Sequence, residues 1–117
     1  MPVLPQTKRL ALQKPSTNTS IIMCNPGSVR ANHYHIRDWH YMYVLSGSFE
    51  YYYREHGSEV APEKTVFKKG EMVFTPPMED HACIFTEDTY LVVASRNPRD
   101  QETYESDVVR IELVTPS

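Results

Sequence analysis

From Ser20 onward, apolar and polar residues alternate over short runs rich in Val, Ile, Phe, Tyr and Thr. A period of two residues is typical of half-buried β-strands. Turn-forming residues separate the runs, and no segment keeps a 3.6-residue apolar period over three helical turns. The pattern predicts strands over residues 20–24, 29–36, 40–46, 48–55, 64–67, 71–75, 81–86, 89–95 and 107–114.

The glycines support this division, because each falls between two predicted strands, where a turn needs a positive φ angle. They are Gly27, Gly47, Gly57 and Gly70. Many short, evenly spaced strands in a chain of 117 residues predict one all-β domain, a jelly-roll β-barrel over residues 20–117. Residues 1–19 hold three prolines, and we expect either an extended N-terminal arm that pairs with a partner subunit or a frayed terminus.

Composition narrows the class of protein and its expected cellular location. The chain is 40% hydrophobic and 23% charged with a net charge of −3, and its Lys and Arg residues are scattered, so neither disorder nor nucleic-acid binding is indicated. No 18-residue apolar run predicts a membrane span, and the N-terminus lacks the charged-then-apolar pattern of a leader. Two cysteines are too few for a disulfide framework, so we expect a reducing, cytoplasmic location.

Histidines form the most informative group. His33 and His35 are two residues apart on one predicted strand, so alternation places both on one face. His40 and His81 begin two other predicted strands, and imidazoles from neighbouring strands can meet at one cation. Neutral imidazole binds Zn, Fe, Cu and Ni. A His-x-His pair alone fits ordinary hydrogen-bonded histidines equally well.

The spacing of these histidines relative to nearby glycines and a proline resembles the cupin superfamily. The stretch 27–47 is similar to the first cupin motif, and the stretch 70–85 to the second. The resemblance implies a small jelly-roll barrel with one metal ion in its mouth. It also implies that His33, His35 and His81 bind that ion.

Three positions depart from the family pattern. His40 stands where the family has a glutamate ligand, Met78 where it has a glycine, and Phe85 where it has an asparagine. Four neutral imidazoles would leave the ion with its full charge and make it a stronger Lewis acid. Such a set suits Fe, Zn, Ni or Cu and weakens the case for Mn. In the alternative interpretation His40 lies outside the coordination sphere and three histidines form the site.

Aromatic residues occupy one face of the predicted strand 48–55. Phe49, Tyr51 and Tyr53 alternate with polar residues, so we expect them to face the interior. Tyr51 and Tyr53 then become candidate catalytic residues that bond the substrate or transfer a proton. Packing in the core, with each hydroxyl satisfied locally, is the alternative.

The same alternation assigns further side chains. It puts Cys83 on the face of His81, near the metal, and it points Arg30 away from the histidines. Val109 is expected to face inward. An apolar row is expected to point outward, toward a second layer or a subunit interface, so we predict a homodimer; the row is Tyr41, Tyr43 and Leu45.

Two classes of enzyme fit these features. One isomerises or epimerises a carbohydrate or another small, oxygen-rich substrate, and the other is an Fe(II)-dependent dioxygenase. A non-catalytic module that binds a small ligand is a third hypothesis, since a fold does not imply catalysis. A structural protein that merely keeps its histidines is the fourth.

Overall fold

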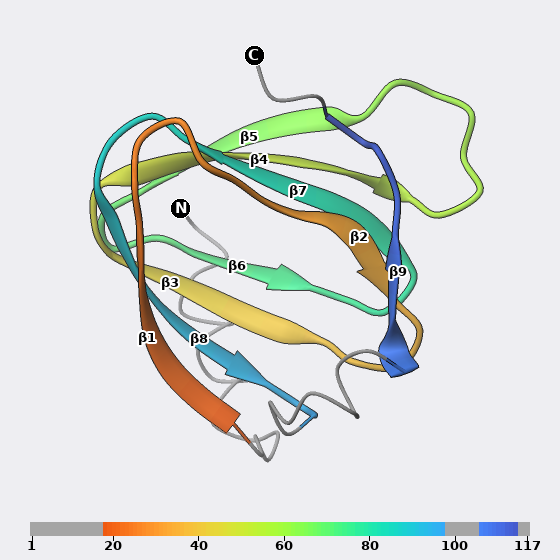
Figure 1. The fold of residues 1–117 in the computed structure, drawn as a ribbon, viewed down its shortest axis with the longest axis horizontal. Helices are drawn as coiled ribbons and strands as arrows, with labels where there is room; N and C mark the ends of the chain where they lie inside the picture. Colours follow the sequence, from red (N-terminus) through yellow and green to blue (C-terminus); the bar gives the residue numbers. More distant parts are fainter. Residues whose placement is uncertain (1–17, 98–105, 115–117) are drawn as a thin grey trace.

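The computed structural model describes residues 18–97 and 106–114, and nearly all of its regular structure is β-strand. Two antiparallel sheets face each other (Figure 1). The four-stranded sheet has the order β1 (Asn18–Cys24), β8 (Thr89–Ser95), β3 (His40–Ser46) and β6 (Met72–Thr75). The five-stranded sheet has the order β5 (Glu63–Lys68), β4 (Ser48–Glu55), β7 (Glu79–Phe85), β2 (Val29–His35) and β9 (Val108–Arg110). The predicted all-β jelly roll is therefore confirmed.

Each predicted strand is present, with boundaries that shift by a few residues. The largest difference is β9, which spans Val108–Arg110 instead of 107–114. Because Val108 pairs with His35, Val108 is the buried residue, and the expectation that Val109 faces inward is wrong. Of the expected N-terminal arm, residues 1–17 lie outside the described residues, and β1 already begins at Asn18.

Gly47 makes the tight turn between β3 and β4 and has a φ of +86°. A Cβ atom at this position would collide with the carbonyl oxygen of Asp88. The Thr89 hydroxyl next to the turn donates to the carbonyl of Ser48 and accepts from the Ser48 N–H. Only glycine satisfies both the conformation and the close approach of the two chain segments here.

The core lies between the two sheets and follows the predicted alternation. Phe49 is fully buried and packs against Phe67 and Phe85, with ring centroids 5.8 and 5.3 Å away. From the opposite sheet, Met42 and Val44 point into the same layer. The aromatic face of β4 is thus the interior face, as the alternation predicts.

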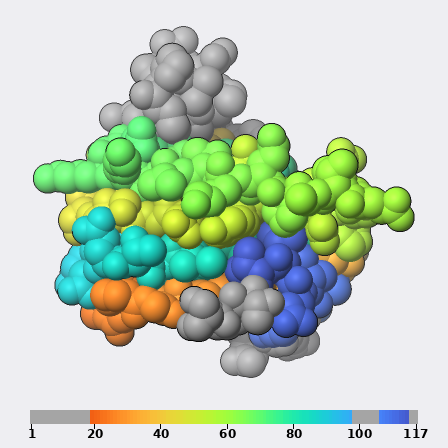
Figure 2. Space-filling model, turned by 90° about the horizontal axis from the view of Figure 1, so that it is seen from above, coloured from red at the N-terminus to blue at the C-terminus, as the bar shows by residue number. Residues whose placement is uncertain are grey.

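The outer faces of the two sheets differ in character. Figure 2 shows the outer face of the five-stranded sheet, with β5, β4 and β7 as successive bands and the β4–β5 loop projecting at one end. The four-stranded sheet carries several large apolar side chains outward: Ile21, Met23, Tyr43, Leu45 and Tyr90. Tyr41 points the same way but is buried, with its ring 4.8 Å from that of Phe74. The homodimer stays a prediction.

Within the described residues, no helix has the length and apolar character needed to cross a membrane.

A β-bulge interrupts β2 between Ala31 and His33. Ala31 and Asn32 both adopt left-handed conformations, with φ angles of 69° and 58°. The bulge inserts an extra residue, so side chains before it change face relative to those after it. Arg30 therefore pairs with Cys83 and lines the interior cavity. The expectation that Arg30 points away from the histidines is wrong, because uninterrupted alternation does not hold across the bulge.

Asn32 is anchored by the segment that follows β9. Its side-chain oxygen accepts the N–H groups of Leu113 and Val114, at 3.1 and 3.0 Å, and its amide donates to the Val114 carbonyl at 2.9 Å. Asparagine also tolerates the left-handed region better than most residues. These bonds stabilise the left-handed conformation of Asn32. Ala31 beside it has no polar side chain that could offset the cost of its own left-handed conformation.

Candidate metal centre

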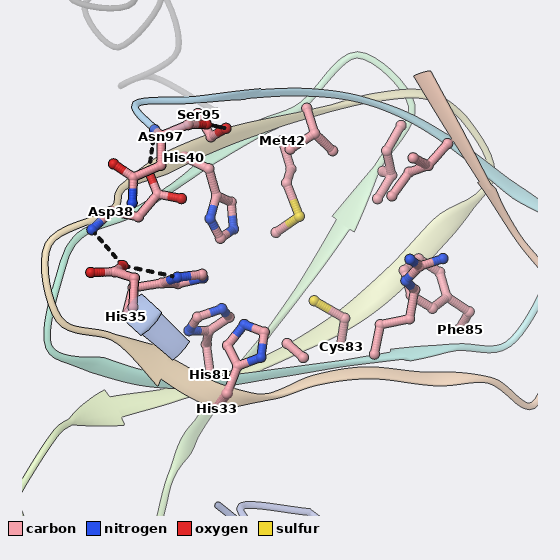
Figure 3. Close-up of a pocket in the computed structure, with 16 residues that line it drawn as sticks. His33, His35, Asp38, His40, Met42, His81, Cys83, Phe85, Ser95 and Asn97 are labelled. Atoms are coloured by element: carbon pink, nitrogen blue, oxygen red, sulfur yellow. Dashed lines mark hydrogen bonds and ion pairs between the residues drawn. The ribbon is translucent and has the colours of Figure 1, made fainter. Parts of the chain in front are cut away.

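Three imidazoles meet at one end of the space between the sheets. β2 supplies His33 and His35, β7 supplies His81, and His33 is the register partner of His81. One ring nitrogen from each lies within 4.8 Å of those of the other two. Figure 3 shows the three rings at the edge of a common cavity. The predicted convergence of these histidines is present in the structure.

The ring of His81 is oriented as a metal ligand requires. Its Nδ1–H donates to the carbonyl of Glu79 at 2.9 Å, because a carbonyl can only accept. This fixes the tautomer in which Nε2 carries the lone pair. The Nε2 atom is buried and has no hydrogen-bond partner among the described residues. A buried acceptor of this kind costs free energy unless something binds it, and a divalent metal ion fits it.

The three imidazoles are neutral near pH 7. Burial, together with His81 and His35, lowers the pKa of His33 to about 3. Burial lowers the pKa of His81 to about 4, although the hydrogen bond to Glu79 acts in the opposite direction. Burial also lowers the pKa of His35, against the raising effect of Asp38 and Asp107. Neutral imidazole is the form that binds a metal ion, so these residues fit one.

Behind His35 lies a carboxylate that the sequence pattern did not reveal. Asp107 Oδ2 is 3.5 Å from His35 Nδ1. Its two oxygens accept the N–H groups of Arg37 and Asp38, each at 2.9 Å, which fixes the carboxylate in place. A carboxylate behind a ligating histidine orients the ring and raises its basicity. No local signal could identify this residue, because Arg37 and Asp107 are 70 positions apart.

Asp38 is the second carboxylate at the cavity, and it too was missed. Its Oδ1 accepts the N–H groups of Trp39 and Asn97, each at 2.9 Å. No hydrogen bond to a described residue uses the Oδ2 atom. Asp38 is buried and lines the cavity, so it places an acceptor near the imidazoles.

His40 comes from the opposite sheet, at the start of β3. Its ring centroid lies 5.6 Å from that of His35 and 5.4 Å from that of His81. It lines the cavity, but it is not part of the group whose nitrogens all lie within 4.8 Å of one another. The four-histidine site therefore stays a prediction, while three of its members are already clustered.

The two tyrosines lie apart from the cavity and are not among the described residues that line it. Tyr51 is buried; its hydroxyl donates to Glu79 at 2.7 Å and accepts from Thr75 at 2.6 Å. The Tyr51 ring stacks 6.3 Å from that of His81. Tyr53 has its hydroxyl 3.4 Å from that of Thr65. A catalytic role for either stays a prediction, and these contacts favour core packing with each hydroxyl satisfied locally.

Cys83 does line the cavity, as its position two residues after His81 predicts. It is buried, and this burial raises the pKa of its thiol to about 12. The thiol is therefore protonated near neutral pH and contributes an apolar surface rather than a nucleophile.

The cavity has a volume of about 150 Å³ and two chemically different ends. Figure 3 shows Asp38, Ser95 and Asn97 on one side of the imidazoles and Cys83 and Phe85 on the other. Polar groups at one end can orient hydroxyl or carbonyl oxygens, and the other end combines apolar side chains with the exposed Arg30. The arrangement suits a small ligand that brings oxygen atoms to the imidazoles.

Comparisons with known proteins agree with this architecture. The model of the cupin domain family matches residues 20–95. A search among curated proteins finds no significant match. Among solved structures, the capsular polysaccharide assembling protein CapF from Staphylococcus aureus superposes with a TM-score of 0.73 at 20% identity, over 85% of this chain and 29% of CapF.

Two 3,4-ketoisomerases have the same fold. The 3,4-ketoisomerase QdtA from Thermoanaerobacterium thermosaccharolyticum, in complex with TDP, gives a TM-score of 0.67 at 18% identity, over 81% of this chain and 66% of that one. A 3,4-ketoisomerase from Helicobacter canadensis gives 0.69 at 13% identity, over 84% and 71%. At these identities the likeness shows the fold, and this chain spans less than a third of CapF.

Proposed function

This chain belongs to the cupin domain family, and from that premise we propose that it is a divalent-metal-binding enzyme that isomerises or epimerises a carbohydrate. The observation that carries the proposal is the cluster of buried, neutral imidazoles, with the Nε2 lone pair of His81 left for a ligand. The ketoisomerase activity named for two proteins of the same fold supports the choice of a sugar substrate.

His33, His35 and His81 would hold the ion, with His40 as the fourth ligand. A bound divalent ion would act as a Lewis acid on a carbonyl or hydroxyl oxygen of the substrate. The donor set is all imidazole, so Fe, Zn, Ni and Cu suit it better than Mn.

Asp38 is placed to move the proton. Isomerisation or epimerisation beside a carbonyl removes a proton from carbon and returns it, which needs a base at the cavity. Asp38 Oδ1 is held by two backbone N–H groups, so Oδ2 is the atom that would accept and return the proton. Ser95 and Asn97 beside it would orient the sugar hydroxyls.

The test combines metal analysis with isotope exchange. Protein purified without an affinity tag should carry about one divalent metal ion per chain by plasma mass spectrometry. In D₂O, it should introduce deuterium next to the carbonyl of a keto sugar such as TDP-4-keto-6-deoxyglucose, as followed by NMR. Asp38→Asn should keep the metal and slow the exchange by roughly 10²- to 10⁴-fold.

Substitutions of the ligands complete the test. Replacing His33, His35 or His81 with Ala should remove the metal from a folded protein. His56→Ala changes a histidine outside the cavity lining and should keep both metal and exchange. Metal content near one per chain in all three ligand variants would disprove the site. His40→Glu should keep binding and shift the preference towards Mn, whereas an unchanged metal profile would place His40 outside the coordination sphere.

The all-imidazole donor set also supports the dioxygenase alternative. Oxygen uptake by the iron-loaded protein, in the presence of a substrate and without isotope exchange, would favour that activity. Tight binding of a sugar with neither uptake nor exchange would favour a non-catalytic binding module.

A further inference from the structure

Arg30 brings a positive charge to the cavity that sequence alternation did not predict. Among the described residues that line the cavity, it is the one Lys or Arg side chain. It faces the cavity because the bulge at Ala31 and Asn32 reverses the alternation of β2. Two successive non-glycine residues in the left-handed region cost free energy, and such strain is typically kept at functional sites.

The guanidinium of Arg30 has no carboxylate partner among the described residues. Its one polar contact there is the Cys24 sulfur atom, 3.8 Å from Nη1. By contrast, Arg54 on the outer face of the same sheet is paired with the buried carboxylate of Asp80 at 3.2 Å. Arg30 is also exposed, so an external anion can reach it. An exposed guanidinium without a carboxylate partner among the described residues is suited to bidentate binding of a phosphate or carboxylate.

The other charged residues of the cavity determine where an anion can bind. Asp38 and Asp107 lie near the imidazoles and repel negative charge there. Arg30 lies opposite Cys83, which is two residues from His81 along β7, a separation of roughly 7 Å. A ligand with its oxygen donors at the imidazoles would therefore direct a negatively charged group toward Arg30.

We propose that Arg30 binds an anionic group, a phosphate or a carboxylate, of the same small ligand whose oxygen atoms face the imidazoles. The inference rests on the proposed function for the location of the sugar, and it adds the residue that binds the charged group of a sugar derivative. The strained bulge is the structural device that turns Arg30 into the cavity.

The test compares matched ligands that differ in charge. Zinc-loaded protein is titrated calorimetrically with fructose, fructose 1-phosphate and 2-keto-gluconate, which are respectively neutral, phosphorylated and carboxylated. We expect at least one anionic sugar to bind about ten times more tightly than fructose or better, and the two anionic sugars show which group the site prefers. Equal affinity for all three, or no binding of either anionic sugar, would overturn the inference.

Substitutions assign the effect to Arg30. Arg30→Gln should reduce the preference for the anionic sugar to within about twofold, and Arg30→Lys should keep part of it. Lys64→Gln removes the same charge from the outer face and should leave the preference unchanged. An unchanged preference in Arg30→Gln, with a normal melting temperature, would disprove the role. Metal content and isotope exchange test the proposed function separately. Repeating the titration on metal-free protein shows whether the anionic sugar binds to Arg30 in the absence of the metal.

Discussion

The two halves of β2 behave differently, although they belong to one continuous strand. After the bulge, His33 and His35 follow the predicted alternation, are buried and lie within the metal cluster. Before the bulge, Arg30 faces the cavity against the prediction and is exposed. One inserted residue separates the buried part of β2, which carries the two histidines, from the exposed part, which carries the positively charged Arg30. The comparison shows that alternation predicts orientation only within an uninterrupted ladder of hydrogen bonds.

The half after the bulge should make the metal-free protein sensitive to acid. His33 and His81 have folded pKa values of about 3 and about 4, below the unfolded value of 6.5. Between these values the unfolded chain binds more protons, so stability is highest above pH 6.5 and is lost as the pH falls toward 4. Each histidine should contribute a slope of up to about 1.4 kcal/mol per pH unit.

Urea unfolding of chelator-treated protein at pH 7, 6 and 5 measures this slope. His81→Asn removes one of the two groups and should make the slope shallower. A slope equal to that of the unmodified protein would mean that His81 is protonated in the folded state.

The carboxylate behind His35 is expected to have the next largest effect. Asp107→Asn keeps the shape of the side chain but removes the negative charge 3.5 Å from His35 Nδ1. Metal affinity should fall by about 10- to 100-fold, as measured by competition with a chromophoric chelator. Glu87→Gln neutralises a carboxylate that instead bonds Ser48 and should leave the affinity unchanged. Equal affinities in the two variants would show that Asp107 has no influence on the site.

The bulge itself should give the smallest effect. Ala31 has a φ of 69°, a conformation that glycine adopts without strain. Ala31→Gly should therefore raise the free energy of unfolding by roughly 0.5–1 kcal/mol, and Ala31→Val should lower it by more than about 1 kcal/mol. Asn32→Gly accepts the same conformation but loses the bonds to Leu113 and Val114, so it should destabilise the protein. Unfolding in urea tests the three variants. An Ala31→Gly protein that is less stable than the unmodified protein would contradict the inferred strain at Ala31.

Much of the fold could be predicted from the sequence, because its signals are local. Alternating residues mark the strands, and each glycine occupies a turn with positive φ. Met78 is informative in the same way: it stands where the family has a glycine, and it adopts a φ of 62°. Its N–H donates to the His35 carbonyl at 2.8 Å, which connects this turn to the end of β2.

The unpredicted parts of the site depend on contacts between distant segments. Asp38 lies between two predicted strands and Asp107 is the first residue of another, and a hydrogen bond between these distant segments brings them together. The position of Arg30 depends on a bulge whose anchor, Asn32, bonds residues more than 80 positions away. Neither composition nor alternation contains this information, whereas the convergence of His33, His35 and His81 follows directly from strand pairing.

The origin of the four histidines has a mechanical consequence. His33, His35 and His81 belong to the five-stranded sheet, whereas His40 belongs to the four-stranded sheet. An ion bound by the first three alone would connect strands of a single sheet and leave the distance between the two sheets unconstrained. An ion that also binds His40 would cross-link the two sheets, so that metal binding would restrict their separation at the mouth of the cavity.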